Sequence, residues 1–356
     1  MIRRIWRLAV AFAIAASMMT EPTIAAPPQR IVAVGDLHGD FEAWREIALR
    51  ARLIDGRNRW RGGSTVLVQL GDITDRGPDS LKIIRHLMRL QGQARRSGGR
   101  VVVVVGNHEA MNMTDDLRYV HPGEFAAFAN AGSDRLRRRV YEANQAAIVA
   151  AHRAVAPAMS DAAIRSAWLA ANPPGKLEHR AAWSPSGALG RWTIANPAVA
   201  RIGDNLFVHG GVSVRYAGVR VDEINRLTAA ALASRTEAPT AIIHDPFGPL
   251  WYRGYATRAS DSEARAAAPG QAHPATAYPP PEAELATVLR STGAKRMVIA
   301  HTPNRAGIAI SHGGRLALID TGISRYYGGK LSYLEIVGDR LVPHSWDRGS
   351  VGGRRP

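Results

Sequence analysis

An α/β fold built on parallel strands is predicted by three short apolar runs, at residues 31–34, 65–70 and 101–105. Each run is bounded by glycine and rich in β-branched residues, which is typical of a strand buried on both faces of a sheet. A polar motif follows each run directly: GDLHG, GDITDRG and GNHE in turn. Active sites of open α/β sheets form at the carboxyl ends of strands, so we expect the three motifs to meet there.

The residue types in these motifs favour a site for two divalent cations. Asp36 and His38 are two residues apart, so both can point to the same side as the chain leaves its strand. Asp72 follows the second run and could bridge to a second cation, and Asn107 follows the third as a neutral ligand. Carboxylate, imidazole and amide oxygen together suit Mn, Fe or Zn, and the absence of cysteine argues against a thiolate site.

Two histidines further along the chain could complete the coordination of the second cation. His209 in FVHGG and His301 in VIAHT each follow another short apolar run. The result would be two metal sites that share Asp72. Cations about 3.5–4 Å apart would turn a bridging water into hydroxide and stabilise both oxygens of an in-line displacement at phosphorus. The sequence therefore predicts hydrolysis of a phosphoester.

The remaining motif residues are candidates for handling the phosphoryl group itself. His108 follows a ligand and could protonate the leaving oxygen, while Asp75 could orient its imidazole and keep it protonated. Arg76 could bind the phosphoryl oxygens, because its planar fork matches phosphate bidentately. Asn107 would face the substrate as well as the metal. The simpler alternative is that these are turn, capping and salt-bridge residues.

The motifs GDxHG, GDxxDRG and GNHE resemble the hallmarks of the PPP-type phosphoprotein phosphatases among the calcineurin-like metallophosphoesterases. The segments NMTDDLRYV at 112–120, PLWYR at 249–253 and YGG at 327–329 resemble most of all the bacterial, Shewanella-like branch. The resemblance extends over residues 31–329. It implies a β-sandwich of two mixed sheets flanked by helices, with the ligands on loops at one end. It also implies that Arg253 is a second phosphate-binding arginine and that Tyr326 or Tyr327 lies in the active site. Asp115 stands where this branch usually has glycine, so the loop there could adopt another conformation.

One catalytic domain is expected over residues 27–347, with a disordered tail at 348–356. The interval between the third motif and His209 is longer than a βα connection needs, and its alanine- and arginine-rich helical patterns predict a mostly helical cap at 111–200. The cap would shape substrate choice; the alternative is a stabilising insertion remote from the chemistry. A Pro/Ala-rich loop is expected at 257–281, a core strand at 316–322 and a hairpin at 331–342.

Residues 1–26 have the pattern of a secretory signal peptide. Three arginines precede an apolar stretch at 8–19 that is too short to span a bilayer comfortably, and alanines follow at a possible cleavage site. The expected location is therefore periplasmic or secreted. An uncleaved anchor is the alternative, and the paired arginines leave the twin-arginine route open.

Charge and composition limit the possible partners. The chain carries a formal net charge of +16, which favours anionic substrates. All but four of its 46 basic residues are arginines, a bias that fits coding composition better than a nucleic-acid footprint. No basic run is interleaved with aromatic residues, so dedicated nucleic-acid binding is not expected. The expected partner is a phosphorylated protein, at phosphotyrosine and/or phosphoserine or phosphothreonine. Nucleotides, dinucleoside polyphosphates and other small phosphoesters are the alternative, as is a non-catalytic phosphate-binding module.

Overall fold

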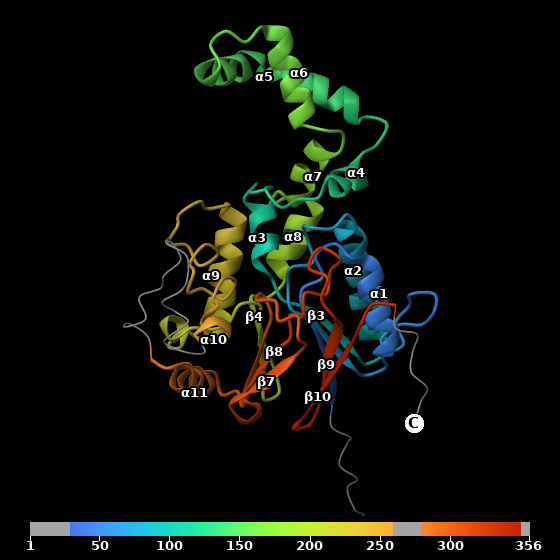
Figure 1. Ribbon diagram of the computed structural model, residues 1–356, viewed down its shortest axis with the longest axis vertical. Coiled ribbons are helices and arrows are strands. Elements are labelled where there is room, and N and C mark those ends of the chain that lie inside the picture. Colours follow the sequence, from blue (N-terminus) through green and yellow to red (C-terminus); the bar gives the residue numbers. More distant parts are fainter. Residues whose placement is uncertain (1–28, 259–278, 350–356) are drawn as a thin grey trace, which may run out of the picture.

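Two five-stranded sheets lie at the centre of the molecule, and helices cover both outer sides (Figure 1). The computed structural model describes residues 29–258 and 279–349. The first sheet has the order β10-β9-β1-β2-β3 and the second β4-β5-β6-β8-β7. Each sheet combines parallel pairs, such as β1 with β2, and antiparallel pairs, such as β1 with β9. The strands are β1 (Arg30–Val34), β2 (Val66–Gln69), β3 (Arg100–Val103), β4 (Val199–Ile202), β5 (Asn205–Val208), β6 (Arg296–Ile299), β7 (Ala309–Ser311), β8 (Leu316–Leu318), β9 (Leu331–Val337) and β10 (Arg340–Trp346).

The alternation of side chains along the strands explains why the sheets pack face to face. In β1, Ile31 and Ala33 join a core cluster shared with Phe207 of β5, in the other sheet. The intervening Val32 and Val34 point the opposite way and pack into the cluster that the helices share. A strand with apolar residues on both faces buries one face between the sheets and the other under helices. The predicted two-sheet sandwich flanked by helices is confirmed.

Helices on the two outer sides come from different parts of the chain (Figure 1). Helices α1 and α2 flank the first sheet, whereas α9, α10 and α11 lie on the side of the second. The α-helices are α1 (Phe41–Arg50), α2 (Ser80–Arg96), α3 (Asn107–Met113), α4 (Pro122–Phe128), α5 (Ser133–Val155), α6 (Asp161–Ala171), α7 (Lys176–Trp183), α8 (Ala188–Ala195), α9 (Val221–Ser234), α10 (Gly254–Thr257) and α11 (Pro281–Thr292). No helix in the described ranges is both long and apolar enough to cross a bilayer.

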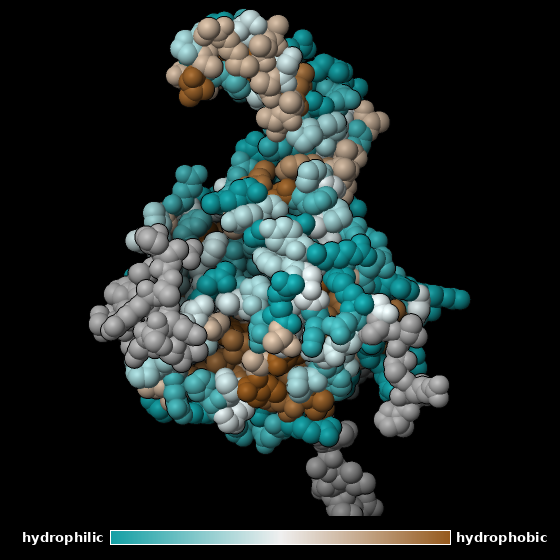
Figure 2. Space-filling model, in the orientation of Figure 1, coloured by the Kyte–Doolittle hydropathy of each residue, from teal (hydrophilic) through white to brown (hydrophobic). Residues whose placement is uncertain are grey.

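The interval expected to form the cap contains helices α4 to α8. Helices α5 and α6 form a hairpin that stands away from the rest of the molecule, while α4 and α7 lie at its base (Figures 1 and 2). Helix α6 begins after its N-cap Ser160, whose hydroxyl accepts a hydrogen bond from Ala163 N. Helix α8 lies in the body beside α9, so within this segment it is the α5–α6 hairpin that projects away (Figure 1).

The C-terminal hairpin forms as predicted, whereas the start of the C-terminal tail differs from the prediction. Strands β9 and β10 pair through Val337 and Arg340, so Gly338 and Asp339 form the expected two-residue turn. Arg348, expected to begin a disordered tail, instead forms an ion pair of 2.9 Å with Asp40. The predicted signal peptide, nearly all of the Pro/Ala-rich loop and the tail from residue 350 lie outside the described residues.

Candidate active site

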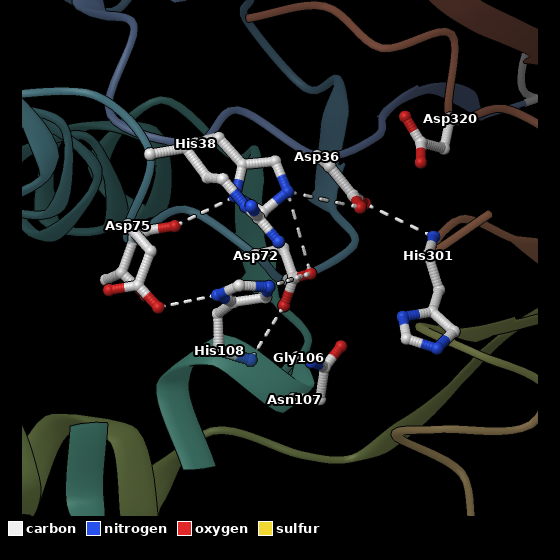
Figure 3. A network of polar contacts seen from close by, with 12 residues as sticks. Asp36, His38, Asp72, Asp75, Gly106, Asn107, His108, His301 and Asp320 are labelled. Atoms are coloured by element: carbon white, nitrogen blue, oxygen red, sulfur yellow. Dashed lines mark hydrogen bonds and ion pairs between the residues drawn. The ribbon is translucent and has the colours of Figure 1, made fainter. Parts of the chain in front are cut away.

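The predicted metal ligands converge at the carboxyl ends of strands from both sheets. His209, which follows β5, lies 3.3 Å from Asp72 through Nε2 and 3.8 Å from Asp36 through Nδ1. Its Nε2 is also 3.0 Å from both Asn107 Oδ1 and His301 Nδ1. The structure thus brings together the full predicted set: Asp36, His38, Asp72, Asn107, His209 and His301. Figure 3 labels all of these except His209.

The backbone is strained where these ligands leave their strands. Several non-glycine site residues have left-handed φ angles: His38 (42°), Asp72 (50°), Asp75 (70°), Arg76 (68°) and His301 (68°). Such conformations cost roughly 1–3 kcal/mol each and persist where the surroundings hold them. Gly71, with φ of 85°, is needed because a Cβ there would lie 2.5 Å from the Gly106 nitrogen. The second and third motifs therefore cross closely enough to place their side chains in one site.

Two groups of side chains have the spacing needed to hold a metal ion. One comprises His38, Asp72 and His108, and the other comprises Asp72, His209 and His301; within each group the ligand atoms lie within 4.8 Å of one another. Asp72 is common to both, as the bridging role requires.

Two of the imidazoles, those of His38 and His209, are oriented to act as ligands through Nε2. The Nδ1 of His38 lies 2.9 Å from the carbonyl oxygen of Thr74, and that of His209 lies 2.7 Å from the carbonyl oxygen of Leu70. A carbonyl can only accept, so each Nδ1 carries the proton and each Nε2 presents a lone pair. His209 Nε2 then faces the acceptor oxygen of Asn107, an arrangement that a cation satisfies. These residues fit a dimetal centre.

Charge in the cluster supports the same conclusion. Burial lowers the pKa of His38 to about 3, so its imidazole stays neutral and can ligate. Burial and the adjacent carboxyl of Asp320 raise the pKa of Asp36 well above its usual range. Burial also opposes ionisation of Asp72, but the imidazoles around it, led by His209, hold the pKa of its carboxyl well below normal. Acidic groups crowded in this way are stabilised by bound cations.

His108 differs from the other imidazoles. Its Nδ1 lies 2.5 Å from Asp75 Oδ2, and its Nε2 lies 3.8 Å from Asp72 Oδ2 (Figure 3). Burial disfavours the charged imidazole, yet Asp72 and Asp75 outweigh burial and raise the pKa of His108. Asn112 holds the arrangement by donating to Asp75 Oδ1 at 2.9 Å and to the His108 carbonyl at 2.9 Å. A protonated imidazole held by a carboxylate is suited to donate a proton.

Arg76 is held between aromatic rings beside this pair. Its guanidinium lies 4.1 Å from the ring centroid of Tyr119 and 4.7 Å from that of Tyr326, and Nη1 donates to the Tyr326 hydroxyl at 2.9 Å. Tyr327 contacts the ring of His38 at 5.3 Å between centroids, so both candidate tyrosines lie at the site. Arg253 donates from Nη1 to the carbonyl of His301 and to Thr302 Oγ1, both at 2.9 Å.

Comparison with known proteins agrees with this geometry. Residues 29–305 match the family described as calcineurin-like phosphoesterase. The chain belongs to this family. Shewanella-like protein phosphatase 2 of Arabidopsis thaliana is 32% identical over 84% of this chain and 72% of its own length. Shewanella-like protein phosphatase 1 of Plasmodium berghei is 26% identical over 83% of this chain and 68% of its own length.

A solved structure also shows the fold. The crystal structure of the cold-active protein-tyrosine phosphatase of a psychrophilic Shewanella species has a TM-score of 0.63 at 22% identity, covering 89% of this chain and 80% of that one. The resemblance to Shewanella-like phosphatases is thus confirmed. As a calcineurin-like phosphoesterase, the protein is a phosphoric ester hydrolase of a family that uses a dimetal centre.

Two residues that hold the site of this calcineurin-like phosphoesterase were missed in the sequence. Glu109 is buried, and its carboxyl accepts the backbone N–H groups of Gly106, Asp72 and Ile73. It thereby ties the second motif to the third, and its place in GNHE was the available signal. Asn112 begins the segment at 112–120 that carries the Shewanella-like resemblance, but that resemblance assigned it no role.

The loop at Asp115 keeps the conformation that a glycine would adopt. Asp115 has φ of 68° despite its side chain. Its carboxyl pairs with Arg180 of α7, with 2.7 Å between Arg180 Nε and Asp115 Oδ1. The substitution therefore leaves the turn in place and adds a contact to the base of the cap.

Replacing Arg76 by alanine is expected to weaken phosphate binding. A charge-assisted hydrogen bond contributes about 1.5–3 kcal/mol, so kcat/KM should fall about 10- to 100-fold and inorganic phosphate should inhibit less strongly. Steady-state kinetics and phosphate inhibition measure both effects. The control is Arg118→Ala, since Arg118 is exposed and pairs with Asp116. Equal kinetics for Arg76→Ala and this control would remove Arg76 from the phosphate site.

Glu124 of α4 should make the free energy of unfolding depend on pH. Burial and the nearby charge of Asp75 raise the pKa of Glu124 from 4.5 to about 8. Between these values the unfolded chain releases this proton while the folded protein keeps it, so stability falls as pH rises through this window. Glu124→Gln should therefore raise Tm by several degrees at pH 8 and by little at pH 4.5. A Tm difference that is the same at both pH values would contradict the burial of a neutral acid.

Proposed function

We propose that this protein is a phosphoprotein phosphatase that hydrolyses phosphomonoesters of tyrosine and/or serine and threonine with two divalent metal ions. The observation that carries the proposal is the His108–Asp75 pair, which lies against the candidate metal ligands, with Arg76 held next to it between Tyr119 and Tyr326. The names of the relatives, Shewanella-like protein phosphatases and a protein-tyrosine phosphatase, support this substrate class.

Different residues of the site bind the metal ions, bind the phosphoryl group and donate the proton. When bound, the cations activate water as the nucleophile and offset the charge of the phosphoryl group. They would be held by the six ligands described above, and Mn, Fe or Zn suits the mixture of carboxylate, imidazole and amide. Arg76 binds and orients the phosphoryl oxygens. Asp75 keeps a proton on His108 Nδ1, so His108 gives up the proton on Nε2 to the leaving oxygen.

Export completes the proposal: the enzyme works in the periplasm or outside the cell. The support is the sequence of residues 1–26 alone, with its arginines, short apolar stretch and alanines. Fractionation of cells that express the full chain tests it. Recovery of the protein from the cytoplasm with residues 1–26 intact would contradict export.

The deciding experiment is an assay of the mature protein, residues 27–356, with added Mn. Substrates are p-nitrophenyl phosphate, phosphotyrosine and phosphothreonine peptides, and nucleotides, with His108→Asn as the control. Peptide turnover that is lost in the variant supports a phosphoprotein phosphatase. Turnover confined to nucleotides or small esters would keep the chemistry and replace the substrate. Absence of turnover with bound phosphate would indicate a non-catalytic module.

A further inference from the structure

The base of the cap contacts the loop that carries Asp75. Glu124, in the first turn of α4, is 2% exposed. Its Oε1 accepts the backbone N–H of Asp75 at 2.8 Å and the hydroxyl of Ser80, the first residue of α2. A single carboxyl oxygen therefore holds both ends of the chain between Asp75 and Ser80.

The bond to Asp75 stabilises a backbone conformation that non-glycine residues seldom adopt. Asp75 has φ of 70°, in the left-handed region that non-glycine residues avoid. This backbone conformation places its carboxyl 2.5 Å from His108 Nδ1. A strained residue stays in place only when its surroundings determine it, and the Glu124 hydrogen bond is one such determinant.

The second oxygen of Glu124 faces another element of the cap. His179 of α7 is fully buried, and its Nε2 lies 4.0 Å from Glu124 Oε2. The His179 ring packs edge-on against Phe125 and Phe128 of α4, at centroid distances of 5.3 and 5.1 Å. The Glu124 carboxyl is therefore confined by α2, α4 and α7 together, and its position depends on how the cap packs.

We propose that Glu124 is a positioning residue that holds Asp75 so that Asp75 can orient His108, which makes proton donation to the leaving group depend on the base of the cap. The proposal rests on the role of His108 as proton donor in the function proposed above. It also gives the cap a part in the chemistry, in contrast to a stabilising insertion remote from the site.

The test uses leaving groups that differ in their need for a proton. p-Nitrophenolate leaves readily without one, whereas phenolate from phenyl phosphate is more basic and benefits from the general acid. Loss of His108 positioning should therefore slow phenyl phosphate more than p-nitrophenyl phosphate. A loss of general stability or of bound metal would slow both equally. Neither substrate is a peptide, so the outcome does not depend on which phosphoprotein is the natural substrate.

Three variants of the full-length, metal-loaded protein are compared with the wild type. In Glu124→Ala, kcat for phenyl phosphate should fall about tenfold or more, kcat for p-nitrophenyl phosphate clearly less, and KM and metal content little. Glu124→Gln should restore most of the activity, because its amide oxygen can accept both hydrogen bonds. Glu124→Asp, which keeps the carboxyl group but is one methylene shorter, should behave like Glu124→Ala.

The matched control is Glu178→Ala. Glu178 of α7 also accepts a hydrogen bond from a serine hydroxyl, that of Ser133, but this pair lies within the cap and does not touch Asp75. It should leave the ratio of the two kcat values unchanged. The proposal is overturned if Glu124→Ala slows both substrates equally, if Glu124→Gln is no better than Glu124→Ala, or if Glu178→Ala changes the ratio as much. If Glu124→Ala does not fold, Glu124→Asp against Glu124→Gln decides the question. A wild type inactive on both esters would refute the proposed function instead.

Discussion

Asp72→Asn should remove activity together with bound metal. Asp72 Oδ2 lies 3.3 Å from His209 Nε2 and 3.8 Å from His38 Nε2, and Asp72 belongs to both candidate metal groups. Asparagine at this position lacks the negative charge, and its side-chain NH2 group cannot bind a cation, so it offers at most one oxygen ligand where aspartate offers two. Because the cations supply several kcal/mol of charge stabilisation, we expect kcat to fall about 10³-fold or more. Elemental analysis and steady-state kinetics measure the two effects.

The control for this change is another buried aspartate. Asp245 is 3% exposed and accepts hydrogen bonds from Tyr216 and Arg215, away from the metal-binding cluster. Asp245→Asn could lower Tm, but it should keep the metal content and kcat of the wild type. Retention of two metal ions and normal turnover in Asp72→Asn would show that Asp72 does not bridge them.

Much of the site could be predicted because its ligands lie next to strands that are easy to recognise. The runs at 31–34 and 101–105 are buried on both faces, as their composition predicted, apart from the partly exposed Val102. Parallel strands end at one edge, so Asp36 and Asn107 had to come close once the strands were placed. The extra imidazoles of His209 and His301 could be found for the same reason, since each follows β5 or β6.

The residues that the sequence did not reveal act through contacts between distant segments. Glu124 bonds to Asp75 across 49 positions, and it lies in an interval whose pattern shows only helices. The left-handed backbone of Asp75 could not be predicted either, because residue type alone favours that conformation for glycine. Hydrophobic periodicity also does not say in which direction a helical hairpin points. A cap was expected from the sequence, but α5 and α6 project away from the body (Figure 1).

His108→Asn should lower kcat by about 10²- to 10⁴-fold, the usual contribution of general acid catalysis, while metal content stays near that of the wild type. His108 also belongs to one candidate metal group, with His38 and Asp72, so its role as acid has to be distinguished from that of a ligand. The distinction rests on protonation. The pKa of His38 falls to about 3 and that of His301 also falls, whereas the pKa of His108 rises. A protonated imidazole has no lone pair for a metal, so His108 is better suited to donate a proton than to ligate.

If His108 donates the proton to the leaving group, the effect of His108→Asn should depend on the substrate. The loss should be larger for a phosphothreonine peptide or phenyl phosphate than for p-nitrophenyl phosphate, whose leaving group needs no proton. His86→Asn is the matched control, because His86 is also buried, accepts from Trp44 Nε1 at 2.9 Å and lies outside the cluster. Stoichiometric loss of metal in His108→Asn, but not in His86→Asn, would make His108 a ligand. The proton for the leaving group would then have to come from elsewhere, and the short bond from His108 Nδ1 to Asp75 would serve to orient a metal ligand.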